Sequence, residues 1–240
     1  MRSTKILIVA SNPNTTAPLA LLKEAREIED AIQSSYYRDA FEVHHCLAAR
    51  ASDLRRKVLG IRPDIIHFCA HGSDFGVYLE NDSGAENLVL VEQLIDFLCE
   101  VGSVKCLLLN SCHSLTAGRQ ASKHIPVVIC FEGKLVDKAA ISFSKGFYES
   151  IAGGDEVKKS YKLGLNAIAM DFKSSDTELY ESHRSLYLGD KNVKANPLAS
   201  GYCFFINHKE YRGKPAFAYV VLFLVALIAS LVFTFRGLLI

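Results

Sequence analysis

The sequence lacks the features that identify several common classes of protein. Its 240 residues carry a formal net charge of only +1, which gives no support for nucleic-acid binding. The seven cysteines are an odd number, scattered singly and mostly inside apolar runs, so no paired disulfide framework is visible. The N-terminal stretch MRSTKILIVASN has an apolar run too short for a secretory signal peptide. We therefore expect no nucleic-acid partner and a reduced, cytosolic setting for most of the chain.

Charge is absent from one long stretch, residues 216–235, AFAYVVLFLVALIASLVFTF. A helix of this length spans roughly 30 Å, the thickness of the hydrocarbon core of a bilayer. A buried core helix is the alternative interpretation, but such helices seldom run this long without one charge. Basic residues precede the span, at Lys209, Arg212 and Lys214, and only Arg236 follows it. The positive-inside rule then predicts a single-pass, tail-anchored protein of the cell inner membrane with its main domain in the cytoplasm.

The rest of the chain has no internal repeat and alternates apolar strands with amphipathic helices. Strands are predicted at 5–11, 41–47, 64–70, 104–111, 127–133 and 201–208, with a short hairpin arm before residues 82–84. Helices are predicted at 19–35, 51–61, 90–101, 137–152 and 155–169. The first helix is expected to bury Leu22, Ala25, Ile28, Glu29 and Ile32. This alternation predicts a doubly wound α/β fold, a mostly parallel sheet with helices on both faces.

These patterns divide the chain into four parts. Residues 1–208 form the predicted main domain, within which 172–200 is a polar, weakly periodic loop or insert. Residues 209–215 are a basic linker next to the membrane, 216–235 the transmembrane helix and 236–240 a short tail.

Two apolar strands end on chemically capable side chains. His71 follows DIIHFCA, and Cys112 follows VKCLLLNS. If these strands are neighbours, both side chains emerge at the same edge of the sheet, where parallel α/β folds carry their chemistry. A neutral imidazole takes the thiol proton, and the thiolate is the nucleophile of acyl transfer. The N–H groups of Gly72 and Cys112 are candidate oxyanion donors, and a helix predicted over SLTAGRQASK would favour the thiolate through its dipole.

Simpler interpretations of the same residues exist. A lone cysteine at a strand end is usually a small buried hydrophobe, and a lone histidine is more often structural. His67, Cys69, His71, Cys112 and His113 also suggest a zinc cluster. Cys69 is expected on the opposite face from His67, however, and no CxxC or helical HxxxH spacing is present. The loop after the first strand contains no glycine to cradle a phosphate. The sequence therefore predicts neither a metal nor a cofactor.

Several blocks together resemble a known family. HFCAHG and LLLNSCHS, followed by VVICFEGKLVDKAAISFSKGFYESI, resemble the CHAT family of caspase-like cysteine peptidases, and the resemblance covers about residues 4–170. It implies a caspase-like fold, a protein substrate, His71 as general base and Cys112 as nucleophile, with Gly72 and Cys112 forming the oxyanion hole. His113 departs from the small or acidic residue that often follows the family's cysteine.

Two further residues are candidates for the substrate pocket. Asp137 stands where the resembled family commonly has an acid, so it either lines the pocket or caps the helix that follows. Asn12 lies beyond the first strand, near the place where this clan walls its substrate cleft.

The function predicted from these patterns is a membrane-anchored cysteine endopeptidase. The resemblance implies an effector of the antiviral-defence or cell-death type, triggered by a small molecule or a partner protein, and a homo-oligomer is a candidate assembly. One alternative is a small-molecule-sensing α/β module whose membrane span is the effector. Another is an inactive scaffold with a peptidase fold, against which the presence of both His71 and Cys112 argues.

Overall fold

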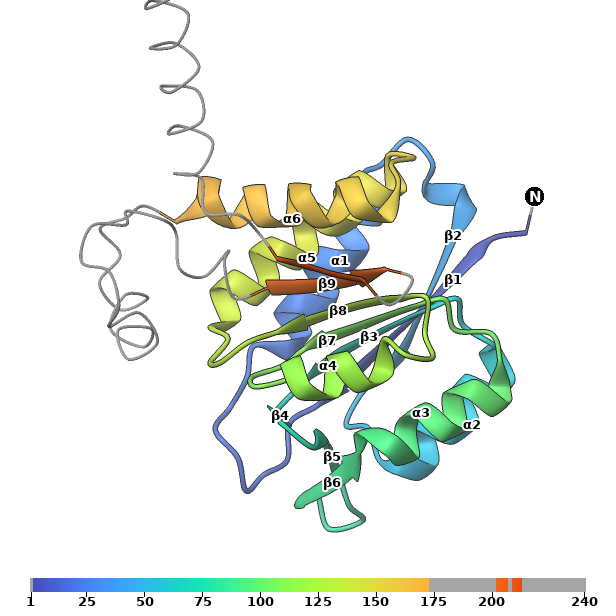
Figure 1. The fold of residues 1–240 in the computed structure, drawn as a ribbon, viewed down its shortest axis with the longest axis vertical. Coiled ribbons are helices and arrows are strands. Elements are labelled where there is room, and N and C mark those ends of the chain that lie inside the picture. The colour runs from blue at the N-terminus through green and yellow to red at the C-terminus, as the bar shows by residue number, and fades with distance from the viewer. Residues whose placement is uncertain (1, 173–201, 207–208, 213–240) are drawn as a thin grey trace, which may run out of the picture.

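The computed structural model describes residues 2–172, 202–206 and 209–212. Figure 1 shows a central sheet crossed by helices. Within the described residues the main sheet has seven strands in the order β10-β9-β8-β7-β3-β1-β2. Their bounds are β1 Thr4–Ser11, β2 Phe41–Cys46, β3 Ile65–Ala70, β7 Cys106–Asn110, β8 Val127–Phe131, β9 Tyr202–Ile206 and β10 Lys209–Arg212.

The strand directions confirm the predicted mostly parallel sheet. β2, β1, β3, β7 and β8 pair in parallel, and β9 then pairs antiparallel with β8. The chain also turns back once more, because Lys209–Arg212 pairs antiparallel with Cys203–Ile206 of β9. Residues 209–212 are thus an edge strand, and the prediction that they belong to a linker is wrong. Two of these four residues, Lys209 and Arg212, supply the basic charge on which the linker prediction relies.

Helices cover both faces of this sheet, as predicted (Figure 1). One face carries α1 Leu21–Gln33, α5 Asp137–Ala152 and α6 Val157–Asp171, and the other carries α2 Ala51–Ile61, α3 Val91–Val101 and α4 Leu115–Ala121. A short 3-10 helix, Arg38–Ala40, leads into β2. The α1 face differs from the prediction in one respect that matters below. Leu22 is 71% exposed, whereas Leu21 and Glu24 are buried beside Ala25, Ile28 and Ile32.

The strands feed two separate hydrophobic cores because successive side chains of a strand point to opposite faces. In β1, Ile6 and Ile8 join the core under α1, α5 and α6, whereas Leu7 and Val9 join the core under α2, α3 and α4. β3 and β7 follow the same alternation, so that Cys69 and Leu108 face the first core, and Phe68 and Leu109 face the second. Burial on both faces explains why these strands read as continuous apolar runs.

A second, smaller sheet follows β3 directly. It contains β4 Gly72–Ser73, β5 Gly76–Glu80 and β6 Glu86–Leu90, paired antiparallel in that order. The sequence predicted only one arm of this hairpin. His71 is therefore the junction between the two sheets, with a parallel strand before it and an antiparallel ribbon after it.

The membrane span predicted at 216–235 and almost all of the insert predicted at 172–200 lie outside the described residues. In the part of the chain that the structure does describe, no helix combines the length and the apolar character needed to cross a membrane.

Helices α5 and α6 approach each other closely through glycine. A Cβ at Gly146 would lie 2.6 Å from the Cβ of Ala167 and 2.9 Å from the carbonyl oxygen of Leu163. We therefore expect Gly146→Ala to lower the free energy of unfolding by about 1–3 kcal/mol through overpacking. Gly60, on the exposed side of α2, has no atom within 4 Å of the same position. Gly60→Ala should instead raise stability by about 0.5–1 kcal/mol. Urea unfolding of both variants measures the difference, and equal midpoints would contradict the packing argument.

Candidate active site

His71 and Cys112 emerge side by side because β3 and β7 are parallel neighbours. Cys69 pairs with Asn110 in that ladder, so each candidate residue stands two positions beyond the last paired one. Both line one pocket at the carboxyl edge of the sheet. The other lining residues come from the start of α1, the end of β3, the turn after β7 and the start of α5: Leu19, Ala20, Leu21, Glu24, Ala70, Asn110, Ser111, Leu135, Asp137, Ala140 and Ile141.

The imidazole of His71 is oriented by a backbone carbonyl. Its Nε2 lies 2.8 Å from the carbonyl oxygen of Ala17, in the loop between β1 and α1. A carbonyl only accepts hydrogen bonds, so Nε2 carries the proton, and in the neutral ring Nδ1 keeps the free lone pair. This is the arrangement of a general base held in one tautomer by a third group. Nothing in the sequence points to Ala17, because the position of a main-chain oxygen does not depend on residue type.

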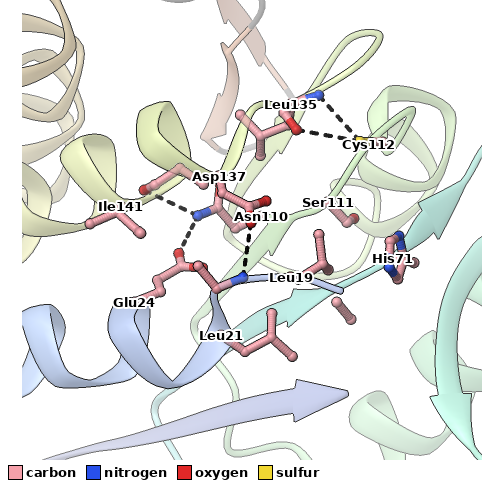
Figure 2. A pocket seen from close by; sticks show the side chains of 13 residues that line it. Leu19, Leu21, Glu24, His71, Asn110, Ser111, Cys112, Leu135, Asp137 and Ile141 are labelled. Carbon is pink, nitrogen blue, oxygen red and sulfur yellow. Dashed lines mark hydrogen bonds between the residues drawn. The ribbon is translucent and has the colours of Figure 1, made fainter. Parts of the chain in front are cut away.

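The thiol of Cys112 is held by the loop that follows β8. The N–H of Leu135 donates to Sγ at 3.2 Å, and Sγ lies 3.6 Å from the carbonyl oxygen of the same residue. Figure 2 shows these two contacts, with His71 on the same side of the pocket. Within the described residues, no hydrogen bond joins Cys112 to His71. Each side chain faces the backbone of a different loop in this structure.

Cys112 sits on a tight turn that carries backbone strain. The next residue, His113, has φ of +52°, in the left-handed region that few side chains other than Asn, Asp and His adopt readily. Such a residue costs about 1–3 kcal/mol and persists only where its surroundings enforce it. Here the His113 N–H donates to the carbonyl oxygen of Gly133 at 2.7 Å. The departure from the resembled family at this position thus has a local conformational role.

A buried serine fixes the same turn from below. Ser114 Oγ accepts from the N–H of Phe131 at 2.9 Å and lies 2.9 Å from the carbonyl oxygen of Ser111. This side chain ties the end of β7 to the end of β8. The helix expected after Cys112 begins only at Leu115 and has seven residues. The structure therefore gives no basis for the expected effect of its dipole on the thiol.

Gly72 allows the two strand ends to approach. A Cβ at this position would lie 2.5 Å from Ser111 Oγ and 2.7 Å from the carbonyl oxygen of Cys112. Its N–H is also free of the β4–β5 pairing. Gly72 lies opposite Val77, and the Tyr78 N–H donates to the His71 carbonyl oxygen, which makes Gly72 and Val77 a non-hydrogen-bonded pair. The Gly72 N–H therefore points away from β5, as an oxyanion donor must.

The two candidate pocket residues lie in different places. Asp137 lines the pocket and also caps a helix, although not its own: Oδ2 accepts from the N–H of Ala20, one residue before α1, at 2.9 Å. Asn12 does not line this pocket. Its Oδ1 accepts from the N–H of Leu19 at 3.3 Å, and it lines a second pocket at the ends of β1 and β2.

A buried polar cluster lies under the pocket, and the sequence analysis missed it. Glu24 on α1 accepts hydrogen bonds from Asn110 Nδ2 and, at 2.8 Å, from Ser144 Oγ. His67 on β3 is fully buried, with Nε2 3.3 Å from Glu24 Oε1 and Nδ1 3.1 Å from the hydroxyl of Tyr148. An acid at a buried position of the apolar stripe of α1 is the signal that points to this cluster.

The cluster also corrects the prediction about Cys69. Ligand atoms of Glu24, His67 and Cys69 lie within 4.8 Å of one another, so His67 and Cys69 share a face of β3. Residues two apart on a strand point the same way, and the assignment of Cys69 to the opposite face was wrong. Burial, and then the Glu24 carboxylate, raise the pKa of the Cys69 thiol well above its ordinary value.

Comparison with known proteins finds relatives that are named as proteases. No protein-family model matches the chain. It is 25% identical over 193 residues, 77% of its length, to a Roc-COR-CHAT protease from an unknown prokaryotic organism. It is 20% identical over 190 residues to a probable protease from Gillisia limnaea. The chain spans 18% and 34% of the length of these two curated relatives.

A solved structure has the same fold. A secreted C11 cysteine protease from Bacteroides thetaiotaomicron, solved in complex with an irreversible peptide inhibitor, superposes with a TM-score of 0.57 at 10% identity. The match covers 85% of this chain and 66% of that one. The mostly parallel sheet with helices on both faces is thus the fold of this cysteine protease, and the relatives similar in sequence are named as proteases.

The contact between Gly72 and the Cys112 turn gives a first test of the site. Gly72→Ala pushes a methyl group into the backbone of Cys112, and displacements of about 1 Å at a reacting centre can cost 10²-fold in rate. We expect alkylation of Cys112 by iodoacetamide to change markedly. Ser73→Ala, at the next residue, should leave the rate unchanged. Peptide mapping by mass spectrometry reads the rate at Cys112. Equal rates in Gly72→Ala and Ser73→Ala would show that the two strand ends are not coupled.

Proposed function

We propose that this chain is a cysteine-type endopeptidase that cleaves protein substrates with His71 and Cys112. The observation that carries the proposal is their placement: a thiol and an oriented imidazole line one pocket at the ends of two adjacent parallel strands. The caspase-like protease fold and the protease-named relatives support it. The inactive-scaffold alternative has less support, because the Ala17 carbonyl holds His71 in the tautomer that a base requires.

The proposed reaction has two halves, the formation of a thioester on Cys112 and its hydrolysis. Nδ1 of His71 takes the proton of the Cys112 thiol, and the thiolate attacks the carbonyl carbon of the scissile peptide bond. The N–H groups of Gly72 and Cys112 donate to the oxyanion of the tetrahedral intermediate. The C–N bond then breaks as His71 returns its proton to the leaving amine. Water, deprotonated by His71, hydrolyses the thioester and regenerates the thiol.

The size of the pocket supports the proposal that the enzyme is triggered. Its volume is about 30 Å³, which has room for little more than a water molecule. Binding sites for small ligands are roughly ten times larger, so a substrate side chain requires the walls to move. In the same state Cys112 faces Leu135 rather than His71. Opening of the loop after β8 would release the thiol and widen the pocket in one movement.

A second pocket gives the sensing alternative its own support and offers a place for a trigger. It has a volume of about 410 Å³ and lies at the ends of β1 and β2, lined by Asn12, Leu22, Leu47 and Glu80 among others. It shares residues 19–21 with the candidate active site. A small molecule bound there would press on the segment that bonds to Asp137 and directly follows the Ala17 loop. We propose that such a ligand, or a partner protein, is the signal that activates this chain as a defence or cell-death effector.

We further propose that residues 216–235 anchor the enzyme in the inner membrane, with the peptidase domain in the cytoplasm. The support is the uncharged run of twenty residues and the excess of Lys and Arg on its N-terminal flank.

The dyad predicts two different losses. Cys112→Ala should abolish cleavage, and His71→Ala should lower it by about two to four orders of magnitude, the usual range for a general base. Cys106→Ser, at a buried cysteine of the same strand and outside the pocket, should keep activity. A cleavage assay on activated protein, with circular dichroism to check folding, measures all three. Full activity in Cys112→Ala would exclude the proposed nucleophile.

The anchor is tested by removal and by protection. Deleting residues 213–240, which leaves β10 intact, should move the protein from the membrane to the soluble fraction, because no other stretch of the sequence is apolar for long enough to span. Protease added outside spheroplasts should leave the domain of the full chain intact. Digestion of the domain in intact spheroplasts would reverse the proposed orientation.

A further inference from the structure

We propose that Glu24 is a positioning residue whose carboxylate, paired with the buried His67, holds Asn110 and through it the turn that carries Cys112. This inference deepens the proposed function and rests on it. Glu24 lies on α1, His67 on β3 and Asn110 at the end of β7, so one cluster joins a helix to the two strands that deliver the dyad. Figure 2 shows Glu24 and Asn110 in contact, on the opposite side of the pocket from His71 and Cys112.

The first step is the contact between Glu24 and Asn110. Asn110 Nδ2 donates to Glu24 Oε1, lies 3.1 Å from Ser144 Oγ and donates to the carbonyl oxygen of Ala140 at 3.4 Å. The side chain of Asn110 is thus held by α1 and α5 at once. Only Ser111 separates Asn110 from Cys112. A shift of the Asn110 side chain is therefore transmitted through one residue to the nucleophile.

The second step is the state of the Glu24 carboxyl. Glu24 is 5% exposed, and burial by itself raises the pKa of a carboxyl. The close contact with His67, together with the hydrogen bonds from Ser144 and Asn110, outweighs burial and lowers the pKa of Glu24 below its ordinary value. Glu24 is therefore ionised at neutral pH, as an acceptor of two donors should be. An ionised carboxylate at this depth is stable only with a partner.

The third step is that His67 is this partner. His67 is fully buried, and its Nε2 lies 3.3 Å from Glu24 Oε1, outside the alignment of a good hydrogen bond but well within ion-pair distance. Its Nδ1 is 3.1 Å from the hydroxyl of Tyr148, so the ring is held at both ends. Removal of His67 would leave the carboxylate without this contact, and burial would then favour the protonated form of Glu24.

The same atoms suggest a metal ion, but the contacts favour a hydrogen-bonded polar cluster. Glu24, His67 and Cys69 form a set of oxygen, nitrogen and sulfur donors that zinc accepts. Glu24 Oε1, however, already accepts from Asn110 and Ser144. The raised pKa of Cys69 keeps its thiol protonated and neutral. Zinc binding by this cluster is therefore one of the results that would contradict the proposal.

The groups that face Glu24 set the expected pH dependence. They are His67 and Cys69 on β3, Tyr148 on α5, Cys106 near Tyr148 on β7, and Asp137, His71 and Cys112 around the pocket. In His67→Gln, Glu24 loses the contact that mainly offsets burial, so its pKa should rise. Because buried carboxyls can rise by about 3–5 pKa units, we expect the acid limb of Cys112 reactivity to move up by more than about one pH unit. In Glu24→Gln/His67→Gln the carboxyl of this cluster is gone, and the limb should return to its wild-type position.

The measurement is the rate of Cys112 alkylation by iodoacetamide in the full chain from pH 5 to 9. Mass spectrometry reads it relative to Cys99, an exposed thiol on α3 at the other face of the sheet, which serves as an internal standard. Asn110→Ala should change the Cys112 rate by about 10²-fold at all pH values, since it breaks the link itself. Ser144→Ala should cause a smaller change in the same direction. Ser142→Ala, at another buried serine of α5, is the matched control and should cause none.

Each outcome decides the matter. An unchanged acid limb in His67→Gln, or a limb that stays shifted in the double variant, would overturn the positioning role. So would a chelator that changes the wild-type rate and zinc that restores it, because the cluster would then hold a metal. If His67→Gln does not fold, the pair Ser144→Ala and Ser142→Ala decides by the same readout, with equal rates overturning the proposal. The test uses no peptide, so a protein that alkylates as expected and cleaves nothing contradicts only the proposed function.

Discussion

The parallel ladder between β3 and β7 is the constraint on which the candidate site depends. It aligns Cys69 with Asn110, and this register places the next residues of both strands at the same edge. A slip of one residue would turn every side chain of one strand to the other face, and would move the thiol and the imidazole apart. The register is secured by burial on both faces, since Phe68 and Leu109 pack into one core while Cys69 and Leu108 pack into the other. The geometry of the candidate site is thus a consequence of the hydrophobic packing.

The cluster around Glu24 adds a polar constraint to this apolar one. Hydrophobic contacts fix which face a strand presents, but they are not directional and leave small displacements cheap. A buried carboxylate with hydrogen-bonded partners is held directionally, and removing one of those partners is costly. The site therefore combines a core that sets the register with a polar cluster that sets the orientation of the Asn110 side chain. Gly72 and Ser114 complete the arrangement from the other two sides of the turn.

The sequence predicted the fold well because the determining signals are local and periodic. Apolar runs of five to eight residues gave the buried parallel strands, and the alternation with helices gave the topology. It singled out His71 and Cys112 as candidates because a polar side chain at the end of an apolar run is visible in one dimension. It missed what depends on three dimensions: the Ala17 carbonyl, the Leu135 backbone and the Glu24 cluster, each of which reaches the site from a distant segment. The position of Asn12 in the neighbouring pocket and the edge strand at 209–212 were missed for the same reason.

One feature of the site has a consequence for genetics. The group that orients His71 is the main-chain oxygen of residue 17, which is already an alanine. Replacing its side chain leaves the oxygen in place, so an alanine scan passes over this position without effect, and so does any ordinary missense survey. The loop is instead sensitive to its length and to its backbone conformation, because insertion or deletion of a residue between β1 and α1 moves the carbonyl itself. Natural variants of this loop should thus differ in their side chains but keep the same length.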